Sequence, residues 1–241
     1  METPEAQPEL IYHHDSYTRE FDAEVTAVDE EAGGVHLDRT AFYPGGGGQP
    51  SDTGRLRFDG GEVAVTGVKR GNLHVVDGSL PEVGATVRGE IDWDRRYRLM
   101  RTHTALHILC GVVWRDYGAQ VTGGNMEPAS GRMDFEFERL DRDLIAEIEE
   151  KVNAEVEAAR DVRVKILPRE EAFQIPDLIR TKINLLPEGI TEVRTVEIVG
   201  LDLQADGGTH VANTREVGTI RLGKFKNKGG INKRIYLELG D

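Results

Sequence analysis

The chain has 241 residues, of which 38% are hydrophobic, and this suffices for one large globular domain or two modest ones. No apolar run approaches the ~20 residues of a membrane helix, the first residues lack a signal-peptide layout, and the single cysteine excludes an internal disulfide, so we expect a cytoplasmic protein with no membrane partner. The formal net charge of -13 argues against a generally basic nucleic-acid-binding protein, but the acid- and arginine-rich composition resembles that of halophilic proteins, whose surfaces are acidic whatever their partner.

Residues 18–92 predict a series of short strands. Their segments are β-branched or alternate between apolar and polar residues, and Gly, Asp and Pro separate them at short intervals. This spacing indicates a small antiparallel β-barrel. The predicted strands are 21–28, 34–37, 56–58, 63–68, 73–76 and 86–91.

After Asp92 the pattern becomes helical. Residues 95–117 run without proline, and residues 141–159 carry apolar side chains at three- and four-residue spacing. Strands return at 162–167, 193–199, 218–222 and 235–239. We therefore predict an α+β fold with a barrel domain at 1–92 and a second domain at 93–241, in which helices lie on a mostly antiparallel sheet.

Four consecutive glycines, Gly45 to Gly48, interrupt the barrel segment. Such a run cannot pack as a strand, so it predicts either a plain turn or a loop that another backbone or a ligand approaches closely. It is not a phosphate-binding P-loop, because no Gly-Lys-Ser/Thr follows.

Two histidines four residues apart predict a shared ligand-binding face on the first helix. His103 and His107 differ by about 40° in azimuth on a helix, so both can reach one ion. The pair alone is weak evidence, and Thr104 replaces the glutamate of a zinc protease motif. Cys110 shares this face but is typical of a small core residue.

A second segment, Asp206-Gly-Gly-Thr-His210, offers further ligands. The two glycines permit a sharp turn that lets Asp206 and His210 converge, and Thr209 adds a hydroxyl; the alternative is a β-turn with an unrelated histidine. A cation held by several imidazoles can lower the pKa of water, so a hydrolase is one interpretation.

Three motifs resemble the alanyl-tRNA editing family. Residues 92–109 resemble its leading histidine helix, residues 206–211 its Cys-Gly-Gly-Thr-His-Val zinc motif, and residues 42–49 its glycine-rich Phe-Tyr-Pro-Glu-Gly-Gly-Gly-Gln loop, with Gly45 in place of the acid. With Pro-Glu-Gly-Ile at 187–190 and the basic C-terminal hairpin, the resemblance covers about residues 18–240 in family order. It identifies the chain as similar to the freestanding AlaX type of medium length.

The resemblance implies a trans-editing hydrolase that deacylates mischarged tRNA(Ala), chiefly seryl-tRNA(Ala), with glycyl-tRNA(Ala) as a further substrate. It implies one Zn²⁺ per chain, the acceptor end of tRNA(Ala) as partner, and neither a nucleotide cofactor nor ATP. The expected metal ligands are His103, His107, Asp206 and His210.

Asp206 departs from the family, which has a cysteine at this position. Carboxylate is an acceptable but harder zinc ligand than thiolate. Three states are open: Asp206 binds the metal, a water replaces it, or the site stays empty. Direct ligation is favoured, because carboxylates suit divalent cations. Whether the metal activates water or positions the substrate is also open.

The same resemblance implies substrate contacts. Thr122 is the expected partner of the serine hydroxyl, although a turn threonine is the alternative, and the glycine-rich loop is expected to face the site through Gly46, Gly47 and Gln49. No catalytic side chain is assigned beyond Thr209 as a candidate hydroxyl.

From Thr219 to Ile235 the chain carries only basic charges. A charge run by itself is typical of a solvated hairpin, but on an acidic chain it gains weight as a phosphate-binding segment. The predicted tRNA phosphate contacts are Lys224, Lys226, Lys228, Lys233 and Arg234.

Two other functions compete with editing. The first is a catalytically inactive tRNA- or protein-binding module that lost its metal because of Asp206. The second is an unrelated metal-dependent hydrolase of small esters, which would act without tRNA. The sequence does not indicate an oligomeric state.

Overall fold

The computed structural model describes residues 7–179 and 189–240. It forms two compact units, residues 1–46 with 50–97 and residues 47–49 with 98–241, so Gly47 to Gln49 belong with the second unit. The proposed domain boundary at residue 92 stays a prediction. Of the Pro-Glu-Gly-Ile motif, residues 187 and 188 lie outside the described residues.

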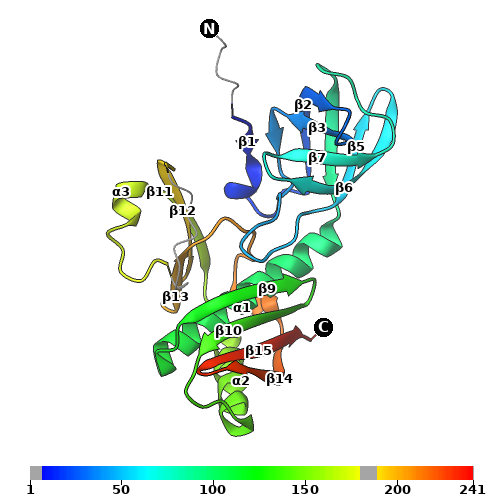
Figure 1. Cartoon of the computed structure of the whole chain (residues 1–241). Helices are drawn as coiled ribbons and strands as arrows, with labels where there is room; N and C mark the ends of the chain where they lie inside the picture. Colours follow the sequence, from blue (N-terminus) through cyan, green and yellow to red (C-terminus); the bar gives the residue numbers. More distant parts are fainter. Residues whose placement is uncertain (1–6, 180–188, 241) are drawn as a thin grey trace. The chain divides into compact units, whose positions relative to one another are not determined.

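The first unit is a closed six-stranded barrel, as predicted, with strand order β2-β3-β7-β6-β5-β8 (Figure 1). Its strands alternate as the sequence does, so that Phe21, Ala23 and Val25 of β2 point inward and are buried. The strands are β2 (Glu20–Asp29), β3 (Gly34–Leu37), β5 (Gly54–Phe58), β6 (Gly61–Lys69), β7 (Leu73–Asp77) and β8 (Thr86–Ile91).

A buried ion pair anchors the beginning of helix α1 (Trp93–Tyr117) in this unit. The Arg96 guanidinium binds the Asp52 carboxylate and donates to the carbonyl of Ala41, and both charged side chains are almost fully buried. Breaking such a pair leaves an uncompensated buried charge and typically costs about 3–5 kcal/mol. The remaining elements are η1 (Ile11–His13) and the parallel pair β1 (Glu9–Leu10) and β4 (Arg39–Thr40).

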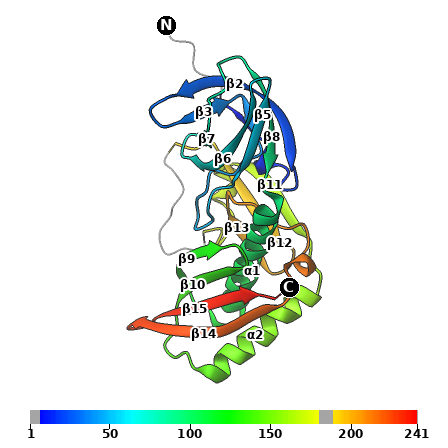
Figure 2. The ribbon, with the colours of Figure 1, turned by 90° about the vertical axis from the view of Figure 1, so that its right-hand side faces the viewer.

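The second unit contains a four-stranded antiparallel sheet in the order β14-β15-β10-β9, whose strands lie side by side in Figure 2. Helix α2 (Arg142–Glu157) begins at Asp141, which accepts from the Leu144 amide, and packs along β14. The strands are β9 (Val121–Glu127), β10 (Ser130–Glu136), β14 (Ile220–Gly229) and β15 (Asn232–Leu239).

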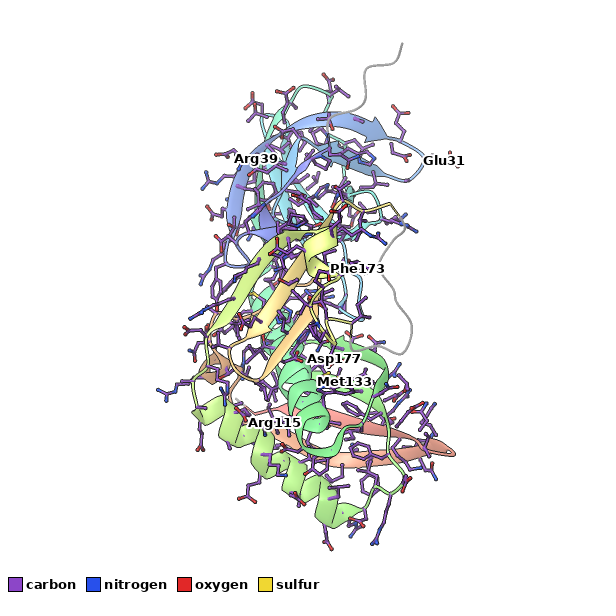
Figure 3. All side chains as sticks on the ribbon, turned by 90° about the vertical axis from the view of Figure 1, so that its left-hand side faces the viewer. Glu31, Arg39, Arg115, Met133, Phe173 and Asp177 are labelled. Atoms are coloured by element: carbon purple, nitrogen blue, oxygen red, sulfur yellow. The ribbon has the colours of Figure 1, made fainter. Side chains whose placement is uncertain are left out.

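A second antiparallel sheet of this unit has the order β11-β12-β13 and lies in front of α1 in Figure 3. The α+β fold with antiparallel sheets is confirmed, but the second unit has two sheets where one was expected. Strands β9, β10 and β13 were not predicted, because their sequences are short and contain glycines or few apolar residues. The elements are β11 (Val162–Pro168), β12 (Glu192–Ile198), β13 (Asp202–Ala205), α3 (Arg169–Ala172) and η2 (Thr214–Val217).

Helix α1 has well-defined ends, and these ends determine where along the helix axis its two histidines lie. The Asp92 carboxylate accepts from the Arg95 amide at the start, and Gly118, with φ 63°, follows the last turn. No helix among the described residues is long and apolar enough to cross a membrane.

Candidate metal centre

The middle of α1 brings two imidazoles together. His103 and His107 stand one turn apart with ring centroids 5.1 Å from each other, and both side chains are buried. The i,i+4 spacing thus produces the shared face that the sequence predicted.

The segment after β13 completes the group. The Gly208 amide donates to Asp206 Oδ1 at 2.6 Å, which folds the segment into a tight turn and directs the carboxylate toward the histidines. Asp206 oxygens lie 3.4 Å from Nε2 of His103, 3.7 Å from Nε2 of His107 and 3.2 Å from Nε2 of His210. One ligand atom from each of these four residues lies within 4.8 Å of the others.

Each imidazole is held from behind by a different polar group. His103 Nδ1 lies 2.9 Å from Gln49 Oε1, His107 Nδ1 lies 3.0 Å from Asp202 Oδ2, and His210 Nδ1 lies 3.2 Å from the Thr104 hydroxyl. In each histidine, Nδ1 therefore contacts the surrounding polar group and Nε2 points toward the centre.

The partners of Gln49 define which way its amide points. Its Oε1 also accepts from the Thr209 backbone amide at 3.1 Å, and its Nε2 donates to Thr209 Oγ1 at 2.8 Å. Since Oε1 can only accept, His103 donates from Nδ1 and keeps the Nε2 lone pair for the centre. Asp202 has the same effect on His107.

This donor set fits a divalent cation. Three imidazole nitrogens and a carboxylate oxygen form a common zinc ligand set, and polar groups behind the rings are the usual way in which ligating histidines are oriented. Cys110 is buried outside the group, with Gln204 Nε2 at 3.3 Å from its sulfur.

The electrostatics of the group are those of tightly coupled charges. Burial acts to raise the pKa of Asp206, but the histidines, His103 foremost, outweigh it and hold that pKa well below its usual range. Burial also acts to lower the pKa of His107, but hydrogen bonds to Asp202 and Asp206 raise it to about 9. Burial, with repulsion from His103, lowers the pKa of His210. A cation would replace the proton on His107 as the partner of Asp206.

Two glycines allow the close packing of this group. A Cβ on Gly208 would lie 2.4 Å from His103 Cε1, and a Cβ on Gly111 of α1 would lie 3.1 Å from Asp202 Cβ. The first position lets the turn lie against the imidazole, and the second lets β13 approach the helix closely enough for Asp202 to reach His107.

The expected substrate residues have separate positions. Gln49 and Thr209 are buried and bound to each other beside His103. Gly46, in the first unit, accepts from the Tyr43 hydroxyl at 3.2 Å, and a Cβ on Gly47 would meet nothing within 4 Å. Thr122 lies in β9, not in a turn, and donates to Asn232 Oδ1 at 3.1 Å. Their substrate roles stay predictions.

The glycine loop has backbone angles that explain its composition. Gly45 to Gly48 all have positive φ, between 58° and 140°, a region that other residues rarely adopt. The Met126 amide of β9 donates to the Gly48 carbonyl at 3.1 Å, and a Cβ on Gly48 would lie 3.0 Å from the Gly124 carbonyl oxygen. The loop thus ends by lying against β9.

The five predicted phosphate contacts divide into two groups. Lys224, Lys226 and Lys228 are exposed on β14. Lys233 is buried and donates to Asn227 and to the Gly230 carbonyl, whereas Arg234 forms a two-point contact with Asp134 at 2.6 and 2.7 Å. Of the five residues, only the first three are exposed.

Several residues of the site were not predicted. Asp202 and Gln204 share a strand face with Asp206, a period-two pattern that could have identified them. Thr104 drew attention in the sequence only because it stands where a zinc protease motif has a glutamate. Arg194, whose Nη1 lies 2.9 Å from the Asp206 carbonyl, comes from β12, and no local sequence signal connects it to the site.

An open groove of about 820 Å³ lies in the first unit, and none of the metal-binding residues lines it. Ion-paired Arg55, Glu62 and Glu90 line it, together with Trp93. The candidate site therefore rests on converging side chains.

Two family models match the sequence. The one described as tRNA synthetases class II (A) matches residues 7–95, and the one described as threonyl and alanyl tRNA synthetase second additional domain matches residues 193–236. The second match includes β12, β13, the Asp206–His210 segment and β14.

Full-length relatives agree with these matches. The chain is 45% identical to the alanyl-tRNA editing protein AlaX-M of Saccharolobus solfataricus, with 95% of this chain and 97% of that protein aligned, and 43% identical to AlaX-M of Methanosarcina acetivorans, with 97% and 99% aligned. It is also 40% identical to an alanine–tRNA ligase of Pyrobaculum neutrophilum, where 90% of this chain aligns with 25% of the ligase.

Proposed function

The chain belongs to the AlaX-M family of alanyl-tRNA editing proteins, and from this premise we propose that it hydrolyses the ester of tRNA(Ala) that carries a wrong amino acid. The expected substrates are seryl-tRNA(Ala) first and glycyl-tRNA(Ala) second. The observation that supports this proposal is the convergence of three Nε2 atoms and one carboxylate on a single point.

The metal dependence is part of the proposal. One Zn²⁺ per chain would be held by His103, His107, Asp206 and His210, and it would supply Lewis acidity at the reacting ester. Direct ligation by Asp206 is supported by its oxygens, which lie 3.2 to 3.7 Å from the three Nε2 atoms.

The chain's own residues orient this centre. Gln49, Asp202 and Thr104 hold the Nδ1 atoms, so the rings cannot rotate without breaking a buried hydrogen bond. Water attacks the ester carbonyl carbon, the bond to the ribose oxygen breaks, and the products are a free amino acid and tRNA. Thr209, fully buried and held by Gln49, stays the candidate hydroxyl near the reaction.

Substrate selection is assigned to two groups of residues. Thr122 donates to Asn232, which leaves its oxygen lone pairs to accept from a serine hydroxyl; Gly46 and Gly47 offer close backbone approach. The exposed Lys224, Lys226 and Lys228 would contact phosphates. We expect the reaction in the cytoplasm, where tRNA is charged, without ATP, and adaptation to high salt stays a prediction.

The test is release of serine from seryl-tRNA(Ala) by the purified protein, with alanyl-tRNA(Ala) spared. The double variant H103A/H210A should lose bound zinc by elemental analysis and lose the activity, while the control H14A/H36A, in the barrel unit, should keep both. A wild-type protein that holds no metal and releases no serine would favour the inactive binding module. Turnover of seryl methyl ester, which lacks the terminal adenosine of tRNA, as fast as that of seryl-tRNA(Ala) would favour a small-ester hydrolase.

A further inference from the structure

The sheet β14-β15-β10-β9 has one face that is buried and one that is not. Along β15, Lys233, Ile235 and Leu237 are buried, whereas Arg234 and Tyr236 alternate with them on the other face and are half-buried. Leu106 of α1 lies against Gly131, which is paired with Leu237, so the helix covers the apolar face. The other face is the outer one.

Directly opposite residues of antiparallel strands point to the same side, so the strand register assigns the outer face residue by residue. Two neighbouring cross-strand rows hold four basic side chains and one acid, in a chain whose net charge is -13. The first row is Lys224, Tyr236, Arg132 and Asn125, and the second is Lys226, Arg234, Asp134 and Gly123.

The single acid in these rows is already neutralised. Asp134 accepts from Arg234 at 2.6 Å and lies 3.6 Å from Arg132, and these cations lower its pKa. No carboxylate of the described residues forms an ion pair with Lys224 or Lys226. These two rows therefore keep a net positive charge, to which Lys224 and Lys226 contribute without a carboxylate partner among the described residues; the flanking rows of the same face add Arg221 with Glu238 and Glu127 on one side and Glu136 on the other.

The geometry of the first row suits a nucleic-acid backbone. Lys224 and Arg132 are two strands apart, which is about 10 Å at ~4.8 Å per strand, so the two cations can contact different phosphates of one backbone. The aromatic Tyr236 lies between them, and Arg234 stands 6.0 Å from its ring.

The row also leads toward the metal-binding group. The row ends on β9 at Asn125, whose Cα lies 3.3 Å from where a Cβ on Gly48 would be. Gln49, which follows Gly48 in the chain, contacts His103. Gly48 lies against the edge strand and the adjacent Gln49 contacts a candidate metal ligand, and both residues belong to the second unit.

We infer that this outer face, centred on Arg132, Lys224 and Lys226, is the surface that holds the phosphate backbone of the tRNA acceptor arm while its 3′ end reaches the metal-binding group. The inference rests on the proposed function and extends it in two ways. It adds Arg132 and Tyr236, which lie outside the basic sequence segment, and it removes Lys233, whose ammonium is buried in the hairpin.

The test compares two triple variants of equal charge. R132Q/K224Q/K226Q removes three charges from the outer face, and Asp134 keeps Arg234 as its partner; R142Q/R163Q/K165Q removes three exposed charges from α2 and β11. A third variant, R132K/K224R/K226R, keeps the charge. Circular dichroism and thermal unfolding verify that each is folded.

Three measurements are made on each variant: binding of uncharged tRNA(Ala) over a salt series, release of serine from seryl-tRNA(Ala), and hydrolysis of seryl-adenosine, which has no phosphates. We expect the outer-face variant to bind tRNA about tenfold more weakly or worse at low salt, with the slope of log K against log salt reduced by about 0.9 for each lost contact. Its hydrolysis of seryl-adenosine should match the wild type, and both other variants should bind tRNA normally.

Unchanged tRNA binding by R132Q/K224Q/K226Q, or an equal loss in R142Q/R163Q/K165Q, would overturn the inference. Failure of the proposed function looks different. In that case the wild-type protein would release no serine from seryl-tRNA(Ala), whatever the outer-face variant does to tRNA binding.

Discussion

Replacing Gly208 by alanine should disable the metal centre through a single methyl group. The new Cβ would lie 2.4 Å from His103 Cε1, 2.5 Å from His103 Nδ1 and 2.7 Å from Gln49 Oε1. The backbone at Gly208 is outside the left-handed region, so alanine itself is not strained there. The clash therefore acts on the ring and on the amide that orients it.

The expected magnitude follows from these distances. Cβ atoms essentially never approach another heavy atom within 3.0 Å, so the imidazole or the turn must move by at least about 0.6 Å. Metal–ligand distances tolerate only about 0.2 Å. We expect metal affinity to fall about 10- to 100-fold, which is ~1.4 to 2.7 kcal/mol, and stability to fall by about 1–3 kcal/mol from overpacking.

The neighbouring glycine provides the control. A Cβ on Gly207 would meet nothing within 4 Å, and its backbone is likewise outside the left-handed region, so G207A should bind metal like the wild type. Zinc affinity is measured by competition with a chromophoric chelator, and serine release from seryl-tRNA(Ala) is measured in parallel. Wild-type zinc affinity in G208A, or an equal loss in G207A, would refute this reasoning.

Three further predictions concern single side chains. Q49A removes the acceptor of the His103 Nδ1 proton and of the Thr209 amide, so zinc affinity should fall about tenfold or more. The control Q174A changes an exposed glutamine and should leave zinc affinity unchanged. Equal zinc affinities of Q49A and Q174A would show that Gln49 does not support the site. D206C exchanges a carboxylate for a softer thiolate and should bind Zn²⁺ more tightly in the same competition, and unchanged affinity would mean that this position does not ligate. Burial lowers the pKa of His74 in the barrel to about 4, so its ring signals in an NMR titration should stay constant from pH 7 to 5. Because the unfolded ring titrates near 6.5, His74 costs no stability above that pH, and barrel stability should fall by up to about 3 kcal/mol as the pH drops to about 4. A titration midpoint of the His74 ring signals near 6.5 in the folded protein would contradict this account.

Much of the fold is encoded in local pattern. The six barrel strands alternate in sequence, and Phe21, Ala23 and Val25 are buried as that alternation requires. The helix carrying His103 and His107 is limited by an Asp cap and a following glycine, and both signals are legible without a structure. Strand β9 was missed, since its glycines carry no alternation and its pairing with β10 is fixed by tertiary packing.

The site was predictable as a set of residue types but not as a network. Spacing and the family resemblance predicted one site formed by His103, His107, Asp206 and His210. The structure places one ligand atom of each within 4.8 Å of the others. The sequence also suggested that Gln49 contacts substrate, which stays a prediction; it did not suggest the contacts of the Gln49 amide with His103 and Thr209. Contacts between residues so far apart in the chain depend on how the backbone is folded.

The sequence by itself determined most of the secondary-structure periods, the two pairs of candidate ligands at four-residue spacing and the concentration of basic charge near the C-terminus, because each of these is a local property of the chain. Only the tertiary structure decided which charges face solvent. Lys233 is buried while Arg132, from a different segment, joins Lys224 on one face, because strand register and not sequence distance sets which side chains are neighbours.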